Sequence, residues 1–346
     1  MISRYCWTGC MELQRIQSVQ ILRGIAAVLV VWHHLALFFG PEFRLGEFPT
    51  GAFGVDIFFP ISGFVIYLTA PRFDWRLFFV RRIARVAPIY WFATIAKVTA
   101  VFVIPTGAAE YKPEVWHFFA SLLFLPATDA GGRPFPPISL GWTLNFEIYF
   151  YLISALALQR FRPHFGLAVS IAIGTGTLIG CVLTKEVSPV FLLLDTISWE
   201  FLYGILIAFL WNRGLRTPQW FSLFLVIVAI AALFVFPDPP AFDPLRPLKW
   251  GLPGALIVWA VLMCENSAPI QKFTAGMLLG NASYSIYIFH PLFIPVVSPL
   301  VIEMVRGADE FAFVLVLVSC VITGTWVHLL FERRINCFFS TVISRA

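Results

Sequence analysis

Five ionisable side chains stand out because each lies within a long apolar stretch of the sequence. They are His33 and His34, Asp56, Glu147 and His290. A charge at the centre of a bilayer costs at least about 2.5–3.5 kcal/mol, so polar side chains in such stretches usually line a cavity or a pathway. The simpler alternative is that these groups pair with one another between helices. In either case, the fold must bring them together from four separate stretches.

Arginines form the second group with an informative spacing. Arg23 precedes His34 by eleven residues, or three helical turns, so both side chains share one helix face. This arrangement suits an anionic ligand that arrives from the cytoplasm. Arg81, Arg82 and Arg85 belong to a run of five arginines. Such a run is typical of a cytoplasmic loop beside anionic lipid. The i, i+1, i+4 spacing of these three would also allow them to grip the phosphates of a donor.

Depth estimates place most of the ionisable side chains at one level. At 1.5 Å per residue, His34 lies about 21 Å and His290 about 16 Å from the cytoplasmic side of a core about 30 Å thick. Glu147 enters from the other side and lies about 18 Å deep, whereas Asp56 lies only about 6 Å below the outer surface. Because adjacent helical residues point about 100° apart, we expect one of His33 and His34 to be structural.

The composition identifies the bilayer as the solvent for these residues. Of the 346 residues, 59% are apolar and 12% are charged, against about 45–50% and about 25% in soluble domains. This excludes an ordinary soluble enzyme. We expect an all-α, polytopic integral membrane protein with about ten transmembrane helices. The spans are expected at 20–39, 52–70, 86–105, 139–158, 166–183, 190–211, 219–236, 249–264, 279–301 and 311–331.

Basic residues set the orientation, because loops rich in Lys and Arg stay in the cytoplasm. With both termini cytoplasmic, ten spans leave sixteen Lys and Arg residues inside and seven outside, with Lys97 within the third span. The net charge of +5 then reflects membrane topology, and we expect no nucleic-acid partner. The chain divides into a cytoplasmic tail at 1–15, a transmembrane domain at 16–335 and a short cytoplasmic tail at 336–346.

Six segments together resemble the acyltransferase-3 family of integral membrane O-acyltransferases, most closely its exopolysaccharide-production branch. Their order and spacing match over nearly the whole chain. The segments are IQSVQILRGIAA followed by WHH at 16–34, GVDIFFPISGF at 54–64, RRIARVAPIYW at 81–91, GWTLNFE at 141–147, EFLYG at 200–204 and LGNASYSIYIFHP at 279–291. Arg23 and His34 take the two fixed positions of the family's Arg-x10-His motif. Pro60 and Asn281 depart from the usual residues of their segments.

The resemblance implies transfer of an acyl group, usually acetyl, from cytoplasmic acyl-CoA to a hydroxyl of a glycan on or beyond the outer face. It implies a location in the cell (inner) membrane. We expect the partners to be the glycan acceptor, acyl-CoA such as acetyl-CoA, the lipid bilayer and proteins of polysaccharide biosynthesis or export. No tightly bound cofactor and no metal are expected.

The resemblance also suggests roles for individual residues. Arg23, Arg81, Arg82 and Arg85 would bind the donor phosphates near the cytoplasmic mouth. We expect His34 to be the central catalytic group, either as general base toward the sugar hydroxyl or as a transient acyl acceptor. Glu147 and Asp56 are candidates to orient His34 or to receive its proton. His290 would polarise the thioester carbonyl or act as a second structural group of the cavity.

Other function classes have less support. A P-loop, a GxGxxG fingerprint, an HExxH motif and a GxSxG elbow are all missing from the sequence, so nucleotide hydrolysis, redox chemistry and zinc proteolysis are not indicated. The alternative from another class is a transporter or flippase for a lipid-linked glycan, in which the buried charges would form a substrate path. The appearance of label from acetyl-CoA on glycan would separate the two.

Overall fold

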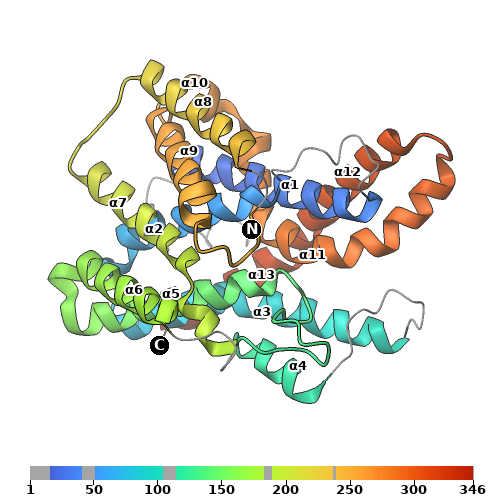
Figure 1. Cartoon of the computed structure of the whole chain (residues 1–346), viewed down its shortest axis with the longest axis horizontal. Coiled ribbons are helices and arrows are strands. Elements are labelled where there is room, and N and C mark those ends of the chain that lie inside the picture. Colours follow the sequence, from blue (N-terminus) through green and yellow to red (C-terminus); the bar gives the residue numbers. More distant parts are fainter. Residues whose placement is uncertain (1–15, 41–50, 104–113, 183–188, 237–238, 346) are drawn as a thin grey trace.

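The structure is a computed structural model that describes residues 16–40, 51–103, 114–182, 189–236 and 239–345. Within these ranges the secondary structure is helical, with no strand. The α-helices are α1 (Gln17–Phe39), α2 (Gly54–Thr69), α3 (Trp75–Val103), α4 (Val115–Leu122), α5 (Gly141–Phe161), α6 (Phe165–Val182), α7 (Trp199–Asn212), α8 (Gln219–Val235), α9 (Leu252–Met263), α10 (Ala268–Lys272), α11 (Thr274–Met304), α12 (Asp309–Val327) and α13 (Arg333–Arg345). In Figure 1, α8, α9 and α10 gather at one corner, while α11 and α12 project together on the opposite side.

Apolar faces that point outward identify the bundle as a membrane protein. Five helical segments within the described ranges are long and apolar enough to cross a bilayer: Gln17–Phe39, Gly51–Arg72, Gly141–Val182, Thr274–Met304 and Asp309–Ile343. On α12, Phe311, Val314, Val318 and Ile322 follow helical spacing and are all exposed. Such a stripe would be unfavourable in water, but it suits contact with lipid.

The predicted spans overlap helices, but the sixth is built differently from the expectation. Predicted at 190–211, it begins with 3-10 turns at Pro189–Leu194 and Thr196–Ser198 before α7 starts. The second turn has a local cause, because the Asp195 carboxylate accepts the Ile197 N–H at 3.1 Å and caps it. Asp195 is therefore a capping residue at a helix entry. The number of crossings and the side of the termini remain predictions.

The ends of the chain are described only in part, and their expected division stays a prediction. The expected tail at 1–15 lies outside the described residues. Residues 336–345, expected to form the short tail at the other end, are helical and make up most of α13. Helix α3 begins at Trp75, eleven residues before the predicted third span, and so includes most of the arginine run. The arginines of that run, from residue 76 onward, therefore share one helix, and their helical spacing applies.

Helices α1 and α11 pack closely enough to fix which of their residues meet. A Cβ on Gly24 would lie 2.8 Å from the Gly280 backbone nitrogen, so glycine is needed for this approach. Next to it, Gln20 Nε2 donates to Asn281 Oδ1 at 3.1 Å. Apolar side chains of α1, α11 and α12 form one buried cluster alongside. Because the helices are parallel in the predicted topology, residues equally far beyond the two glycines come side by side.

Segments predicted to lie on the same side of the membrane meet in the structure. At one end, the Gln17 and Ser18 N–H groups both donate to the Glu265 carboxylate at 2.8 Å, which also places a negative charge at the start of α1. At the other end, Phe135 stacks on Phe242, with ring centroids 6.2 Å apart. Each contact joins two segments that the ten-span prediction places on the same side of the membrane.

Candidate active site

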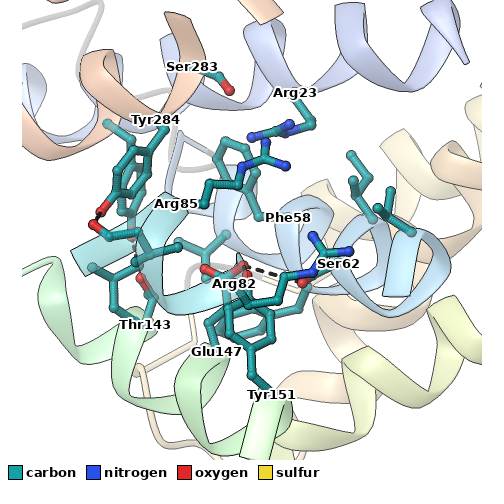
Figure 2. Close-up of a pocket in the computed structure, with 17 residues that line it drawn as sticks. Arg23, Phe58, Ser62, Arg82, Arg85, Thr143, Glu147, Tyr151, Ser283 and Tyr284 are labelled. Carbon is teal, nitrogen blue, oxygen red and sulfur yellow. Dashed lines mark hydrogen bonds between the residues drawn. The ribbon is translucent and has the colours of Figure 1, made fainter. Parts of the chain in front are cut away.

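A narrow cavity of about 100 Å³ lies among α1, α2, α3, α5 and α11 (Figure 2). Its wall combines apolar side chains from α2 with polar side chains from all five helices. The polar lining residues are Arg23, Ser62, Arg82, Arg85, Thr143, Glu147, Tyr151, Ser283, Tyr284 and Tyr287. A mostly apolar space with a few convergent polar groups is the usual form of a small-molecule site.

Three arginines dominate the charge of this cavity. Arg23 comes from α1, and Arg82 and Arg85 come from α3. Figure 2 shows Arg23 and Arg85 side by side, with Arg82 on the opposite wall. Arg82 Nη2 donates to Thr69 Oγ1 at 2.7 Å, which fixes one edge of its guanidinium group. Because three positive groups converge on one cavity, this arrangement favours an anionic ligand.

Arg81 was predicted to join these arginines, but it lies apart from the cavity. Its guanidinium carbon sits 4.6 Å from the centroid of the Phe73 ring. The separation follows from helix geometry, because Arg81 and Arg82 point about 100° apart on α3. The cavity therefore selects three of the four arginines that the sequence proposed as phosphate ligands.

Among the described residues, Glu147 is the one acidic residue that lines the cavity. Its Oε1 accepts hydrogen bonds from Ser62 Oγ, at 3.3 Å, and from the Tyr151 hydroxyl. The sequence suggested that Glu147 orients His34, but these bonds turn the carboxylate toward α2 and along α5. In Figure 2, Glu147 lies next to Arg82. Its position suits a residue that balances part of the arginine charge.

His34 and His290 form a pair between α1 and α11. Their ring centroids are 5.1 Å apart, with the planes inclined at 63°. His34 lies ten residues beyond Gly24, and His290 lies ten residues beyond Gly280. The close glycine contact and parallel packing thus explain why the two imidazoles meet. The prediction that they share one depth is consistent with this pairing.

Hydrogen bonds fix the same tautomer in both rings. His34 Nδ1 lies 2.9 Å from the Val30 carbonyl oxygen, and His290 Nδ1 lies 3.0 Å from that of Ile286. A carbonyl can only accept, so each Nδ1 carries the proton and each neutral ring presents the lone pair of Nε2. In this neutral tautomer His290 has no proton on Nε2, so it would offer a lone pair to the site and not a hydrogen-bond donor. Its role in the reaction stays a prediction.

Tyr287 connects the cavity to this histidine pair. Its side chain lines the cavity, and its hydroxyl lies 2.9 Å from Thr143 Oγ1. On the other side, the Tyr287 ring centroid is 6.3 Å from that of His290. A chemical group bound beside Thr143 is therefore separated from the histidine pair by the Tyr287 side chain.

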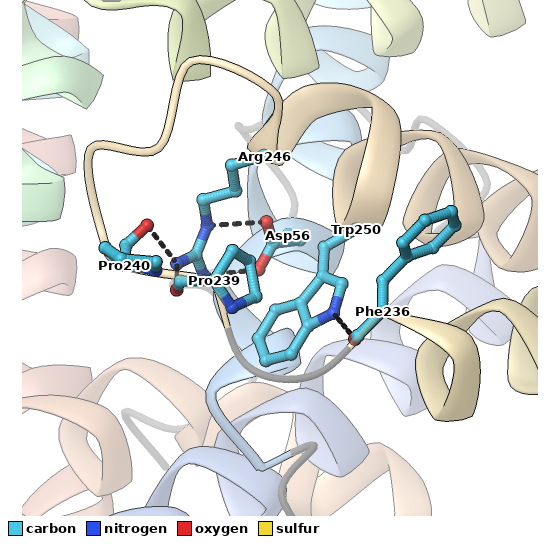
Figure 3. A network of polar contacts seen from close by, with 6 residues as sticks. All are labelled: Asp56, Phe236, Pro239, Pro240, Arg246 and Trp250. Atoms are coloured by element: carbon cyan, nitrogen blue, oxygen red, sulfur yellow. Dashed lines mark hydrogen bonds and ion pairs between the residues drawn. The ribbon is translucent and has the colours of Figure 1, made fainter.

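Asp56 has a different environment from the one the sequence suggested. Its side chain is 0% exposed, and both carboxylate oxygens accept from Arg246: Oδ1 from Nε at 2.9 Å and Oδ2 from Nη2 at 2.7 Å (Figure 3). Arg246 Nη1 also donates to the Pro239 carbonyl at 3.2 Å. This two-point ion pair occupies the groups that would otherwise orient His34, so Asp56 is placed as an anchor for the loop that carries Arg246.

Several site residues were missed by the sequence-based reasoning. Ser62 and Tyr287 lie inside segments whose motifs were recognised, but only the ionisable members of those segments were singled out. Tyr151 lies one turn beyond Glu147, and this i, i+4 spacing was the signal that could have revealed it. Arg246 counted only as one of the basic residues outside. No local feature links it to Asp56, which lies 190 residues away in the chain.

Comparison with known proteins gives a consistent assignment. Residues 16–331 match the family model described as an acyltransferase domain, Acyl_transf_3. The chain is 31% identical over 312 residues to the exopolysaccharide production protein ExoZ of Rhizobium meliloti, covering 86% of this chain and 93% of that protein. It is 26% identical over 324 residues to the peptidoglycan O-acetyltransferase OatA of Listeria monocytogenes, covering 82% of this chain and 50% of that one.

A third relative is the putative peptidoglycan O-acetyltransferase YrhL of Bacillus subtilis, 25% identical over 361 residues and matched over 54% of its length. The chain thus spans about half of each peptidoglycan relative. No solved structure matches the chain. The transporter alternative gains no support from these matches. The family model covers most of the sequence, and the chain belongs to the membrane-embedded acyltransferase-3 family and is an acyltransferase.

Proposed function

We propose that this acyltransferase moves an acetyl or other short acyl group from cytoplasmic acyl-CoA to a hydroxyl of an exopolysaccharide or other cell-surface glycan. The observation that carries the proposal is the cavity with three arginines whose far wall, at Tyr287, adjoins two imidazole bases. We also propose that the protein resides in the cell (inner) membrane and works beside proteins of polysaccharide biosynthesis or export.

The donor would bind with its phosphates at the arginines. Arg23, Arg82 and Arg85 supply guanidinium groups that match phosphate oxygens in geometry and charge. The cavity is too narrow for the whole of coenzyme A, so the phosphates would stay at its arginine-rich mouth. The slender thioester arm would then extend along α5 toward Thr143 and Tyr287.

The reaction would use the Nε2 lone pair of His34. As a base, Nε2 takes the proton of the sugar hydroxyl while the hydroxyl oxygen attacks the thioester carbonyl; the C–S bond breaks, and the thiolate takes up that proton. As an acyl acceptor, Nε2 itself bonds to the acyl carbon while the C–S bond breaks and the thiolate leaves. The hydroxyl oxygen then attacks the acyl carbon, the C–N bond to Nε2 breaks, and the hydroxyl proton passes to His290 Nε2. His290, in the same tautomer, offers a neighbouring site for the proton in either route.

Purified protein in liposomes containing radiolabelled acetyl-CoA, with de-O-acetylated exopolysaccharide oligosaccharides as acceptor, provides the test. We expect His34→Ala to lower transfer about 10²–10⁴-fold. His33→Ala is the matched control, because its ring lies next to His34, at 5.2 Å, but points from another helix face. Full transfer by a correctly inserted His34→Ala variant would contradict the proposed role.

A deletion strain distinguishes the two function classes. Loss of ester-linked acetyl from a polymer that is still secreted supports the acyltransferase reaction on that glycan. Loss of the polymer itself, with the acetyl content of residual polymer unchanged, would favour an export or flippase function instead.

A further inference from the structure

Three aromatic side chains form a partly exposed cluster at the end of α5 that the topology places outside. Phe242 stacks on Phe135, with ring centroids 6.2 Å apart and planes inclined at 19°. Trp142 meets Phe242 edge to face, with centroids 5.5 Å apart. All three side chains are intermediate in exposure. We call Phe135, Trp142 and Phe242 the aromatic platform.

The platform adjoins the cavity described above. Trp142 lies in the first turn of α5, and the next residues, Thr143 and Leu144, line the cavity. Along the same helix, Glu147 and Tyr151 reach the arginine end. From Trp142 to Tyr151 the helix rises about 13 Å. The helix therefore links an aromatic end to a cationic end, with the Thr143–Tyr287 contact between them.

The strap at 239–246 holds Phe242 in place. Its last residue, Arg246, is 3% exposed, and its guanidinium group is bound to Asp56 on α2 and to the Pro239 and Pro240 carbonyls (Figure 3). A buried two-point ion pair tolerates little movement, so the strap is fixed at its base. Phe242 is thereby pressed against α5, where its ring meets Trp142 and Phe146.

Two charged pairs neighbour the platform residues in the chain. Lys249 Nζ donates at 2.6 Å to Oδ2 of Asp243, the residue after Phe242, and the Lys249 side chain is 30% exposed. Arg133, two residues before Phe135, pairs with Asp129 at 2.9 Å. Aromatic faces present an apolar surface of low conformational entropy, while such charged pairs can hydrogen-bond hydroxyl groups. This combination matches a pyranose ring, which has apolar C–H faces and a rim of hydroxyls.

We propose that the aromatic platform is the acceptor subsite, where a sugar ring of the glycan stacks on Phe242 and Trp142 and presents a hydroxyl toward Thr143 and Tyr287. This rests on the proposed function, since it assigns the acceptor of that same reaction. It separates the substrates at opposite ends of α5: the donor phosphates at the arginines and the acceptor ring at the platform. Arg246 is a positioning residue in this arrangement, because it acts through the strap.

The test measures the acceptor and the donor separately, with de-O-acetylated exopolysaccharide oligosaccharides and acetyl-CoA. We expect Phe242→Ala and Phe135→Ala to raise the KM for the oligosaccharides about five- to tenfold, while the KM for acetyl-CoA changes less than twofold. Phe242→Tyr should restore the acceptor KM. Phe224→Ala on α8, a residue 53% exposed on the apolar surface, is the matched control and should leave both values unchanged.

Saturation-transfer NMR with the same oligosaccharides gives a readout that does not require turnover. Ring C–H protons of one sugar face should receive saturation from the wild type, and Phe242→Ala should abolish it. Binding without acyl transfer would overturn the proposed function but leave the platform as a sugar site. Transfer with an unchanged acceptor KM in both Phe→Ala variants would overturn the platform while the function stands.

Discussion

Two regions of this bundle hold arginine between helices, and they compensate its charge in opposite ways. Arg246 in the strap is 3% exposed, whereas Arg23 and Arg82 in the cavity are half-buried and Arg85 is exposed. In the strap, one guanidinium group meets one carboxylate at two points and two backbone carbonyls besides. In the cavity, three guanidinium groups line the wall together with Glu147, the one acidic lining residue in the part of the chain that the structure describes. The strap guanidinium group is paired with a carboxylate, whereas the described cavity lining carries three guanidinium groups against one carboxyl group.

The difference separates structure from binding. Burying a charge costs several kcal/mol unless a partner compensates for it, and the Asp56–Arg246 pair meets that requirement internally. An excess of like charge is retained in a cavity when a ligand of opposite charge completes it. The rule that charged residues within membrane stretches mark functional sites would have given both regions the same role. The contacts favour a binding role for the cavity and a structural role for the strap.

The largest expected effect comes from breaking the strap pair. Asp56→Leu leaves Arg246 buried without its carboxylate, and we expect it to reduce the free energy of unfolding by about 3–5 kcal/mol. Thermal unfolding in detergent measures this. The double variant Asp56→Leu/Arg246→Met removes both charges and should recover most of the loss. If Asp56→Leu instead kept the stability of the wild type and lost only turnover, Asp56 would act in the reaction. The contrast between a structural strap and a binding cavity would then be wrong.

An intermediate effect should follow from changing the cavity side. Arg82→Lys keeps the charge but loses the planar fork, so we expect the KM for acetyl-CoA to rise about tenfold with little change in stability. Arg81→Lys is the matched control, since Arg81 packs over Phe73 outside the cavity. Equal effects of the two substitutions, measured by steady-state kinetics in liposomes, would show that the arginine run acts as general surface charge.

The smallest effect is expected at the edge of the strap and depends on pH. The Lys249 ammonium group donates to Asp243 and holds the pKa of that carboxyl below its usual value. A lowered folded-state pKa stabilises above the unfolded value of about 3.9, and the contribution is lost as pH falls through the folded value.

Lys249→Met should therefore lower stability at pH 7 by less than about 1 kcal/mol and flatten its decline below about pH 4. Melting temperatures from pH 7 to pH 3 check this. Arg306→Met, at a pair exposed by 79% and 72%, should leave the profile unchanged. If Lys249→Met lowered the stability at pH 7 as much as Asp56→Leu, the Lys249–Asp243 pair would hold the strap in place, and the Asp56–Arg246 pair would not have the main structural role.

Much of the helical framework follows from hydropathy, but details of the helix ends do not. The stretch at 190–211 has the apolarity of a span, yet its first part forms 3-10 turns, the second of which is capped by the Asp195 carboxylate at the Ile197 N–H. Conversely, α3 extends back through a basic segment that apolarity alone leaves out. Hydropathy reports the solvent that a stretch prefers, whereas caps and side-chain hydrogen bonds set where each helix begins.

The site was predictable in its residue types and less so in its contacts. Arg23, Arg82, Arg85 and Glu147 were singled out from the sequence, and they line one cavity. His34 and His290 were placed at one depth, but their pairing depends on α1 and α11 approaching at Gly24 and Gly280, as a small-residue contact permits. Among the cavity hydroxyls, Tyr151 was signalled only by its i, i+4 spacing from Glu147. Ser62 and Tyr287 lie within recognised motifs, but nothing local separates them from other Ser and Tyr residues of apolar helices.

By itself the sequence determined an all-α membrane protein, the family resemblance, and which ionisable groups had to be accommodated, because apolar runs, charge bias and motif spacing are local properties of the chain. Only the tertiary structure decided that Asp56 pairs with Arg246, that Arg81 leaves the cavity, and that the two imidazoles meet through equal spacing from a glycine contact. Each of these depends on how helices far apart in the chain rotate and slide against one another, which no single stretch encodes.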